Sequence, residues 1–329
     1  MCITLFNLAF LCKIGTATSI HRASDKHPIK RPFMYTQVLA VMAPVILIPG
    51  IGYIWSKTNQ AFDTAAIGQL VMLLTAPCLI LSTFSETQLN LPQLFSIGGI
   101  AVAVTLIMGG ITWVCASALH KAPEPYMLCT MFPNLGNIGL PVCFFAFGDE
   151  GLAFALAYFL AGAFLHFSIG IMLISGQKWY TALMRSPIIY ASVLAIAMLA
   201  TDSHFPAWAL NTISLIGQLS IPLMLLALGV SLAHLSIQQV PTNTGFALLR
   251  LGGGFGLSYV IASGFSFSPI AFSVILIQSS MPSAVFNYIL ALRYARAANN
   301  VAAIIVISTL ISFITLPWLV HCLLLQHAA

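Results

Sequence analysis

The sequence predicts an all-α polytopic membrane protein, and three observations support this class. Of the 329 residues, 60% are hydrophobic and only 6% are charged, and the mean hydropathy is +0.99. A soluble domain carries about a quarter charged residues, so this chain cannot cover a surface that faces water. Its apolar runs reach the roughly 20 residues that a membrane-crossing helix needs, and they lack the alternation of membrane β-strands. Helices are therefore expected to cross the lipid bilayer.

Ten apolar segments of the chain are interpreted as crossings. They cover residues 37–55, 65–84, 94–119, 126–147, 151–174, 188–200, 208–232, 246–265, 270–292 and 301–325. Because ten is an even number, both ends of the chain are expected on the same side of the membrane.

The basic residues indicate which side faces the cytoplasm. Lys57, Lys121 and Lys178 each follow an odd-numbered segment, and Arg250 lies at the start of the eighth segment, next to the seventh loop. The other basic residues of odd-numbered loops are Arg185, Arg293 and Arg296. The loops after even-numbered segments contain no lysine or arginine. Since cytoplasmic loops carry an excess of these residues, odd-numbered loops are predicted inside and both termini outside.

Residues 1–33 do not fit this topology, because they place basic residues on the side predicted outside. These residues are Lys13, Arg22, Lys26, Lys30 and Arg31. The apolar stretch 1–12 precedes the charges, which reverses the order found in a signal peptide. We interpret residues 1–33 as an N-terminal extension, which is either a product of start-site assignment, with Met34 as the natural start, or a disordered tail.

Prolines at corresponding positions indicate an internal repeat. Pro77 and Pro222 lie 145 positions apart in two similar apolar stretches, and Pro133 and Pro282 lie 149 positions apart in two others. Two landmarks with nearly one period predict two repeats of five helices. The predicted repeats are residues 34–175 and 187–329. Because five is odd, the second repeat must enter the membrane from the opposite side, and such inverted pairs are common in secondary transporters.

The stretch FPNLGNIGLP (132–141) predicts a break in the fourth segment. Pro133 lacks an N–H and clashes with the preceding helical turn, and the glycines tolerate unusual backbone angles. A break frees backbone groups that lipid cannot satisfy, so it must face protein or a watery cavity. The second half-helix presents the positive end of its dipole there, which suits an anion. Asn134 and Asn137, on one face of that half-helix, are predicted to donate to a carboxylate.

The ninth segment contains a similar stretch, QSSMPSAVFNYILA (278–291). Pro282 is predicted to break it, with Ser283 following as Asn134 follows Pro133. If the two broken segments cross, two half-helix N-termini converge near the middle of the membrane. The predicted substrate site therefore comprises Pro133, Asn134, Asn137, Gln278, Pro282, Ser283 and Asn287. The alternative is that the prolines only kink helices that polar side chains hold together.

These motifs resemble those of a known family. FPNLGNIGLPVCFFAFG (132–148), IPLMLLALGVSL (221–232) and MPSAVFNYILALRY (281–294) are similar to fourth-, seventh- and ninth-segment motifs of the auxin efflux carrier family. The resemblance extends from Met34 to the end of the chain. It implies ten crossings, two inverted five-helix repeats and crossed broken helices, as in the bile-acid symporter and sodium/proton antiporter folds. It also implies that Pro133 and Pro282 lie at the crossover, with Asn134 beside the substrate.

The resemblance further implies a secondary transporter, an efflux carrier, of small organic anions such as mono- or dicarboxylates. Segments three to five and eight to ten would move against segments one, two, six and seven to give alternating access. The short loop 176–186, in place of the long central loop of the long plant carriers, favours a bacterial-type member in the plasma membrane, the bacterial inner membrane. Members of the family also suggest a homodimer.

The sequence offers one candidate for a proton or pathway residue. No Asp or Glu lies in the middle of a segment, so a carboxylate relay for protons or cations is not expected. His166 lies inside the fifth segment, and the ordinary histidine pKa of about 6.5 suits proton transfer. The alternative is a neutral histidine hydrogen-bonded to a neighbouring helix.

Other classes of function have less support from the sequence. An anion channel and a non-transporting membrane sensor stay open as alternatives. The chain contains no HExxH motif and no pair of aspartates within the segments, so no enzyme is expected. Seven cysteines without metal-ligand spacing predict neither a metal nor another cofactor, and dispersed basic residues predict no nucleic-acid partner. The predicted partners are an organic anion and the lipid bilayer.

Overall fold

The computed structural model describes residues 31–58, 63–86, 90–176, 187–233 and 240–328. Within these ranges the regular elements are helices, and the one extended feature is an isolated bridge. Seven helical stretches are long and apolar enough to cross a membrane, which supports the predicted all-α polytopic class. Residues 1–30 of the predicted extension, and Lys178 and Arg185, lie outside the described residues.

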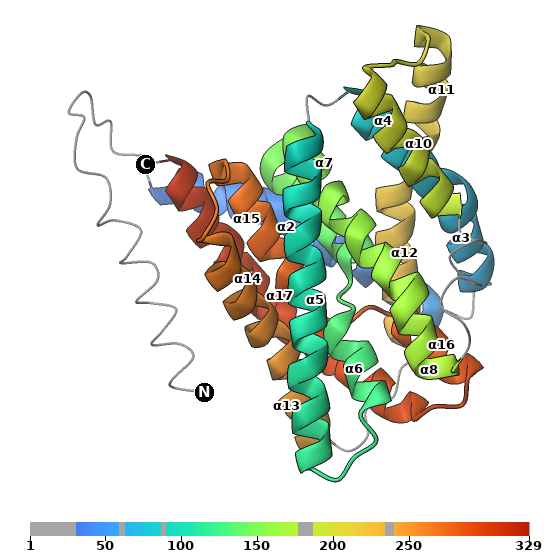
Figure 1. Ribbon diagram of the computed structural model, residues 1–329, viewed down its shortest axis with the longest axis vertical. Helices are drawn as coiled ribbons and strands as arrows, with labels where there is room; N and C mark the ends of the chain where they lie inside the picture. Colours follow the sequence, from blue (N-terminus) through green and yellow to red (C-terminus); the bar gives the residue numbers. More distant parts are fainter. Residues whose placement is uncertain (1–30, 59–62, 87–89, 177–186, 234–239, 329) are drawn as a thin grey trace.

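The helices follow one another along the chain as labelled in Figure 1. The first part contains α2 (Arg31–Lys57), α3 (Thr64–Leu70), η1 (Val71–Thr75), α4 (Ala76–Glu86), α5 (Leu91–Ala118), α6 (Glu124–Met131), η2 (Leu135–Gly139), α7 (Leu140–Leu165), η3 (His166–Gly170) and α8 (Ile171–Ser175). The second part contains α10 (Pro187–Thr201), α11 (Ala207–Gln218), α12 (Ser220–Ala233), α13 (Val240–Leu248), η4 (Leu249–Gly253), α14 (Gly254–Ala262), α15 (Pro269–Ser279), α16 (Phe286–Arg293) and α17 (Ala298–Ala328). The elements η1 to η4 are single π-helical turns that join neighbouring α-helices or begin one.

Two continuous helical stretches, Ala66–Ser85 and Ala207–Ala233, change their hydrogen-bonding pattern next to the prolines that indicated a repeat. Pro77 lies in the first turn of α4, directly after η1, and Pro222 lies in the first turn of α12, after α11 has ended. Proline lacks the N–H that a regular helix uses, so each of these prolines lies where the helical hydrogen bonding changes. The corresponding placement agrees with the sequence pattern, and the inverted five-helix repeat itself stays a prediction.

The stretch Leu135–Ser175 is 41 residues long, and Gly148 divides it. Gly148 has φ 63° and ψ −151°, a conformation that residues with a side chain rarely adopt. A straight helix of this length would extend about 60 Å, about twice the hydrocarbon thickness of a bilayer. The break falls between the predicted fourth and fifth segments, and the neighbouring Asp149 and Glu150 are exposed.

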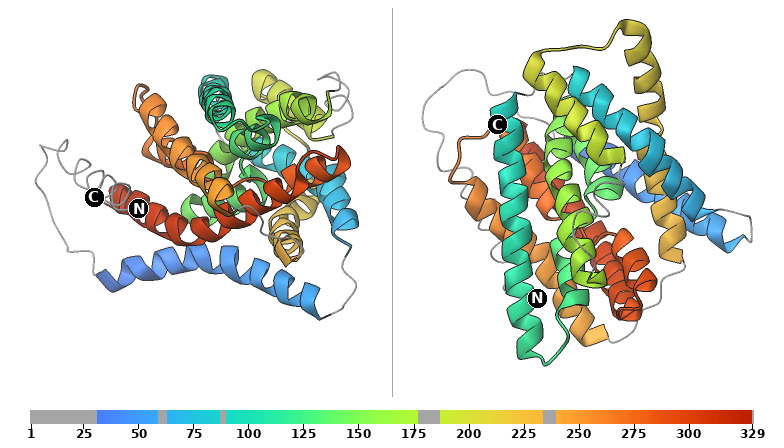
Figure 2. Two further views of the ribbon diagram at one scale, coloured as in Figure 1. Left: turned by 90° about the horizontal axis from the view of Figure 1, so that it is seen from below. Right: turned by 45° about the vertical axis from the view of Figure 1, so that its right-hand side comes forward.

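The helices form two packed groups. In the first, α2 packs on α12, and α4 packs on α10 and α11. Gly229 allows the close contact between α12 and α2, because a Cβ at this position would collide with the Pro49 carbonyl. In the second, α7 packs on α5 and α15, and α13 packs on α17. Most of the first group lies on the right of Figure 1, with α5, α13, α14 and α15 on the left. The two groups also touch, since α2 packs on α17 along one side of the molecule (Figure 2).

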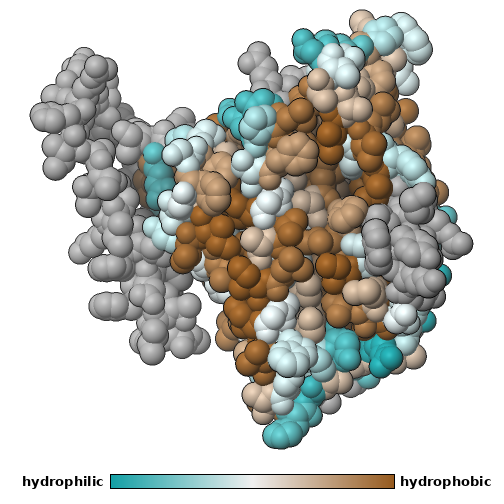
Figure 3. Space-filling model, in the orientation of Figure 1, coloured by the Kyte–Doolittle hydropathy of each residue, from teal (hydrophilic) through white to brown (hydrophobic). Residues whose placement is uncertain are grey.

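Apolar side chains cover the middle of the molecular surface. Figure 3 shows a hydrophobic band between hydrophilic patches at the upper and lower ends of the molecule. Large apolar side chains such as Trp113, Val260 and Ile314 are exposed, as expected of a surface that faces lipid. Lys57 Nζ donates to the Ala233 carbonyl at 3.4 Å, so the ends of two odd-numbered predicted segments lie together, as the charge pattern requires.

Candidate functional site: a crossing of two broken helices

The fourth predicted segment is broken as expected. α6 ends at Met131, and the helix resumes with η2 after three residues. Phe132 has an extended backbone (φ −111°, ψ 91°), which turns the chain out of the helix before Pro133. Asn134 is the N-cap of the second half-helix, where its Oδ1 accepts a hydrogen bond from the Asn137 N–H at 3.1 Å. An asparagine in this position satisfies one of the N–H groups that a helix start exposes.

The ninth predicted segment is broken too. α15 ends at Ser279, α16 begins at Phe286, and Pro282 lies in the non-helical interval. The two breaks cross in the interior of the protein, where Pro133 and Ser283 form an isolated antiparallel bridge. Both bridge residues are buried. We call this place, where the two breaks lie against each other, the crossing.

The two breaks satisfy each other's backbone groups. The Asn134 N–H donates to the Pro282 carbonyl at 2.7 Å, and the Ala284 N–H donates to the Phe132 carbonyl at 3.1 Å. Lipid offers no such partners, so the breaks are stable at membrane depth only because they lie against each other.

Asn287 and Ser283 hold the crossing together. Asn287 Nδ2 donates to the Phe132 carbonyl at 3.0 Å and to Ser283 Oγ at 3.1 Å, so one side chain spans both breaks. The Ser283 N–H in turn donates to Ser308 Oγ of α17 at 3.2 Å. Asn287 and Ser283 are fully buried, so these contacts fix the geometry of the crossing. Their contact with a substrate stays a prediction.

Buried polar atoms without hydrogen-bond partners lie at the crossing. Asn134 Nδ2 and Asn287 Oδ1 have none, although Asn134 is only 4% exposed and Asn287 is fully buried. A buried polar atom without a partner costs about 1–3 kcal/mol. The free donor of Asn134 lies at the N-terminus of a half-helix, where a carboxylate oxygen would satisfy it.

The structure places Gln278 and Asn137 at the edges of the crossing. Gln278 Nε2 donates to the Ala155 carbonyl of α7 at 3.3 Å, and its side chain lies against Gly139. Gln278 therefore joins α15 to α7. Asn137 is half-buried, and the glycine before it lies close to Met224 of α12. The turn η2, which contains Asn137, packs on α12 and so lies at the boundary between the two helix groups.

His166 also lies at the crossing, between two aromatic rings. Phe132 stacks on it, with ring centroids 4.3 Å apart and planes 4° apart, and Phe286 contacts it edge-on at 5.4 Å. Phe132 is the first residue of one break and Phe286 is the first helical residue after the other, so the imidazole contacts both sides of the crossing. The ring also lies beside the Asn287 side chain.

The position of Arg250 corrects a sequence prediction. We expected it beside a cytoplasmic loop, but the helical stretch Val240–Ala262 begins earlier than predicted, and Arg250 lies near its middle with 1% exposure. Its guanidinium donates to the carbonyls of Thr130 and Ser279. Sequence reasoning missed this role because it used the arginine as a marker of the membrane side. The apolar sequence on both sides of the arginine was the indication of its depth.

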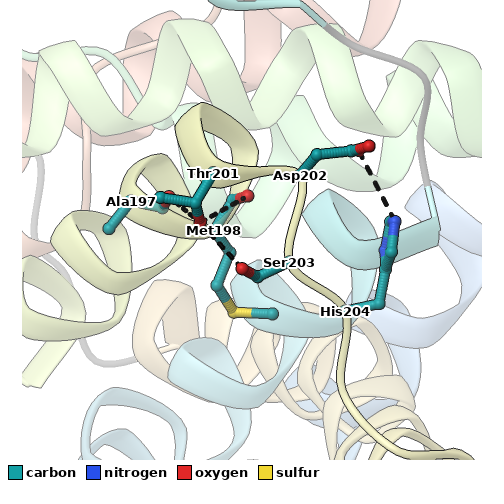
Figure 4. A network of polar contacts seen from close by, with 6 residues as sticks. All are labelled: Ala197, Met198, Thr201, Asp202, Ser203 and His204. Atoms are coloured by element: carbon teal, nitrogen blue, oxygen red, sulfur yellow. Dashed lines mark hydrogen bonds and ion pairs between the residues drawn. The ribbon is translucent and has the colours of Figure 1, made fainter.

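A separate group of polar contacts lies on the surface, in the loop between α10 and α11 (Figure 4). Thr201 Oγ1 lies 2.8 Å from both the Ala197 carbonyl and Ser203 Oγ, and His204 Nε2 lies 3.7 Å from Asp202 Oδ1. The four polar side chains are exposed. We assign this group to closing the end of α10, not to binding a ligand.

The fold and the crossing together define the class of the protein. Broken helices that meet in the interior of a polytopic helical membrane protein are typical of membrane transporters. A family model described as "Membrane transport protein" matches residues 37–182 and 175–320. The chain belongs to this family, the auxin efflux carrier family that its motifs resemble, and it is a transporter rather than an enzyme.

Two relatives are transporters from archaea. The chain is 27% identical over 302 residues to an uncharacterized transporter of Methanothermobacter thermautotrophicus, an alignment that covers 85% of this chain and 95% of the relative. It is 21% identical over 266 residues to an uncharacterized transporter of Methanocaldococcus jannaschii, with 76% and 86% covered. The similarity extends over most of each relative, as expected for the same overall architecture.

Proposed function

We propose that this protein is a secondary carrier, acting in efflux, of small organic anions such as mono- or dicarboxylates, which bind at the crossing of the broken helices. The observation that carries the proposal is the buried Asn134 amide, whose Nδ2 has no partner at the start of a half-helix. A carboxylate oxygen accepts hydrogen bonds from such a donor and is attracted by the positive end of the helix dipole. This end of the half-helix would repel a cation.

The surroundings of the crossing favour an anion as well. The acidic residues of the described chain lie in loops or at helix ends, as Glu124, Asp149 and Glu150 illustrate. No carboxylate of the described chain therefore repels an anion at the crossing. The neighbouring side chains are amides and hydroxyls, which orient a substrate without adding charge.

The packing of the helices supports alternating access. The turn η2, which directly follows Asn134, packs on α7 of one group and on α12 of the other, so a substrate at the crossing would lie beside both groups. We propose that the group containing α5 to α8 and α13 to α17 moves against the group containing α2 to α4 and α10 to α12. Such a movement opens a site at the boundary to one side of the membrane and then to the other.

The proposal includes a topology of ten crossings in the plasma membrane, with both termini outside. In this count α6 with the first part of α7 is one crossing, and α15 with α16 is another. The beginning of α2 and the end of α17 lie on the same side of the molecule in Figure 1, as an even number of crossings requires. The inverted repeat and the homodimer stay predictions.

Uptake into proteoliposomes tests the proposal. A panel of mono- and dicarboxylates is offered while pH and membrane potential are varied separately. We expect saturable uptake of at least one of these anions that responds to the potential, which acts with about 2.3 kcal/mol per charge per 100 mV. Flux that does not saturate would indicate a channel, and binding without flux would indicate a sensor. Either result contradicts the carrier mechanism.

The stacked position of His166 gives a second prediction. His166→Phe retains an aromatic ring between its two neighbours and is expected to keep anion uptake within about twofold of the wild type. His166→Ala loses stacking worth about 0.5–1.5 kcal/mol and is expected to lower anion uptake about threefold to tenfold. Uptake measured over a range of pH checks both. If His166→Phe abolishes uptake and its pH dependence together, the histidine carries protons instead.

A further inference from the structure

Arg250 places a full positive charge near the middle of a helix that is expected to cross the membrane. It is 1% exposed, and no carboxylate of the described residues is within ion-pairing distance of it. An arginine at this depth is costly, and intramembrane charges therefore usually have a function. The proposed substrate site, which lies at the N-terminal ends of the half-helices, does not explain it.

The partners of Arg250 are the ends of two helices. Its terminal nitrogens donate to the carbonyl of Thr130, in the last turn of α6, and to the carbonyl of Ser279, the last residue of α15. A guanidinium suits this task because its donors are fixed in one plane. Gly254 provides the space, since a Cβ there would collide with Arg250 and with the Ser279 carbonyl. The Tyr158 hydroxyl holds Ser279 Oγ at 2.8 Å on the same side.

The helix dipole gives each of the four helix ends at the crossing a partial charge, which can be compared with the charge of Arg250. A helix C-terminus is equivalent to about −0.5 of an elementary charge, so the ends of α6 and α15 together present about −1. The guanidinium supplies +1 at these ends. The starts of the other two half-helices, at Asn134 and Phe286, present about +0.5 each. Once Arg250 has neutralised the C-terminal ends, about one positive charge is left for a ligand.

We infer that Arg250 is a built-in counter-cation for the crossing. Its guanidinium neutralises the C-terminal ends of both half-helices and fixes them to each other. The crossing then presents only its N-terminal ends to a ligand, and their combined charge of about +1 attracts an anion. The effect of Arg250 on ligand binding rests on the proposed function, whereas its neutralisation of the helix ends does not. Arg250 is thus a positioning residue that touches helix ends rather than substrate.

Thermal unfolding of the purified full-length protein tests the role at the helix ends without measuring transport. Arg250→Met removes the charge but keeps most of the side-chain length, and it is expected to lower the melting temperature by about 5–10 °C. Arg250→Ala leaves a space in which free guanidinium fits. Millimolar guanidinium chloride is expected to raise the melting temperature of this variant by about 2–5 °C relative to choline chloride, and to leave the wild type and Arg250→Met unchanged.

Lys57 provides a matched control, because it also donates to a helix-end carbonyl but lies at the surface. Lys57→Ala is expected to shift the melting temperature by less than about 2 °C. If Arg250→Met also lowers the melting temperature by less than about 2 °C, the inference is overturned. It is also overturned if guanidinium chloride and choline chloride change the melting temperature of Arg250→Ala equally. If neither neutral variant folds, Arg250→Lys decides: a folded protein supports the charge role, and a further failure to fold overturns it.

Uptake kinetics test the effect of Arg250 on ligand binding. In Arg250→Met the dipole ends cancel, so the KM for a monocarboxylate is expected to rise by about tenfold or more, whereas Arg250→Lys stays within about threefold of the wild type. An unchanged KM in Arg250→Met overturns this part. If the wild type transports no organic anion, the proposed function fails, while the unfolding experiment still decides the role of Arg250 at the helix ends.

Discussion

Asn134→Asp is expected to lower saturable carboxylate uptake by about 100-fold or more, while the protein stays folded. Aspartate and asparagine are equivalent N-caps, so the new side chain can still accept the Asn137 N–H. The substitution replaces the free Nδ2 donor by an oxygen that carries negative charge. This oxygen repels a carboxylate substrate and weakens the positive end of the half-helix. Initial uptake rates in proteoliposomes, normalised to incorporated protein, measure the effect.

Asn90 offers a matched control for this substitution. It caps α5 in the same way, with its Oδ1 accepting the Gln93 N–H at 2.9 Å, but it lies exposed at the helix start. Asn90→Asp is expected to keep uptake within about twofold of the wild type. If Asn134→Asp transports as well as the wild type, the substrate binds elsewhere. If both variants lose uptake equally, the change acts on folding and not on the site.

The breaks in the two helices could be predicted from the sequence because proline and glycine act on the backbone locally. Pro133 and Pro282 each remove an N–H from an apolar run, and this is visible without any knowledge of the partner helix. The capping position of Asn134 follows from its place directly after the first break. The apolar character of the flanking residues then places both breaks at membrane depth.

The contacts that complete the crossing could not be predicted, because they join residues far apart in the chain. Asn287 reaches the Phe132 carbonyl across 155 positions, and Arg250 reaches the Thr130 carbonyl across 120. Such contacts depend on how the helices pack, and no local pattern contains that information. The contacts of His166 with Phe132 and Phe286 could not be predicted for the same reason. The position of Arg250 was predicted wrongly for a second reason. The rule that cytoplasmic loops are rich in Lys and Arg takes no account of how deep in the membrane an arginine lies.

Asn287→Leu is expected to abolish anion uptake and to lower the melting temperature by about 5 °C. Leucine has a similar volume but cannot donate, so the substitution removes the bonds to the Phe132 carbonyl and to Ser283 Oγ together. The two breaks then keep their backbone pairing but lose the side chain that fixes their relative position. Because the half-helix ends must converge on one anion, a small displacement is expected to reduce transport far more than stability. Uptake is therefore measured well below the melting temperature of the variant.

Asn300 is the control, because it makes a comparable but longer bond away from the crossing. Its Nδ2 donates to the Tyr126 hydroxyl at 3.4 Å near the start of α17, in a half-buried position. Asn300→Leu is expected to change the melting temperature by less than about 2 °C and to keep uptake within about twofold. If Asn287→Leu is destabilised but transports at the wild-type rate, Asn287 supports the fold without positioning the site. Loss of uptake without loss of stability would instead indicate that its free Oδ1 contacts the substrate directly, and this would contradict the positioning role.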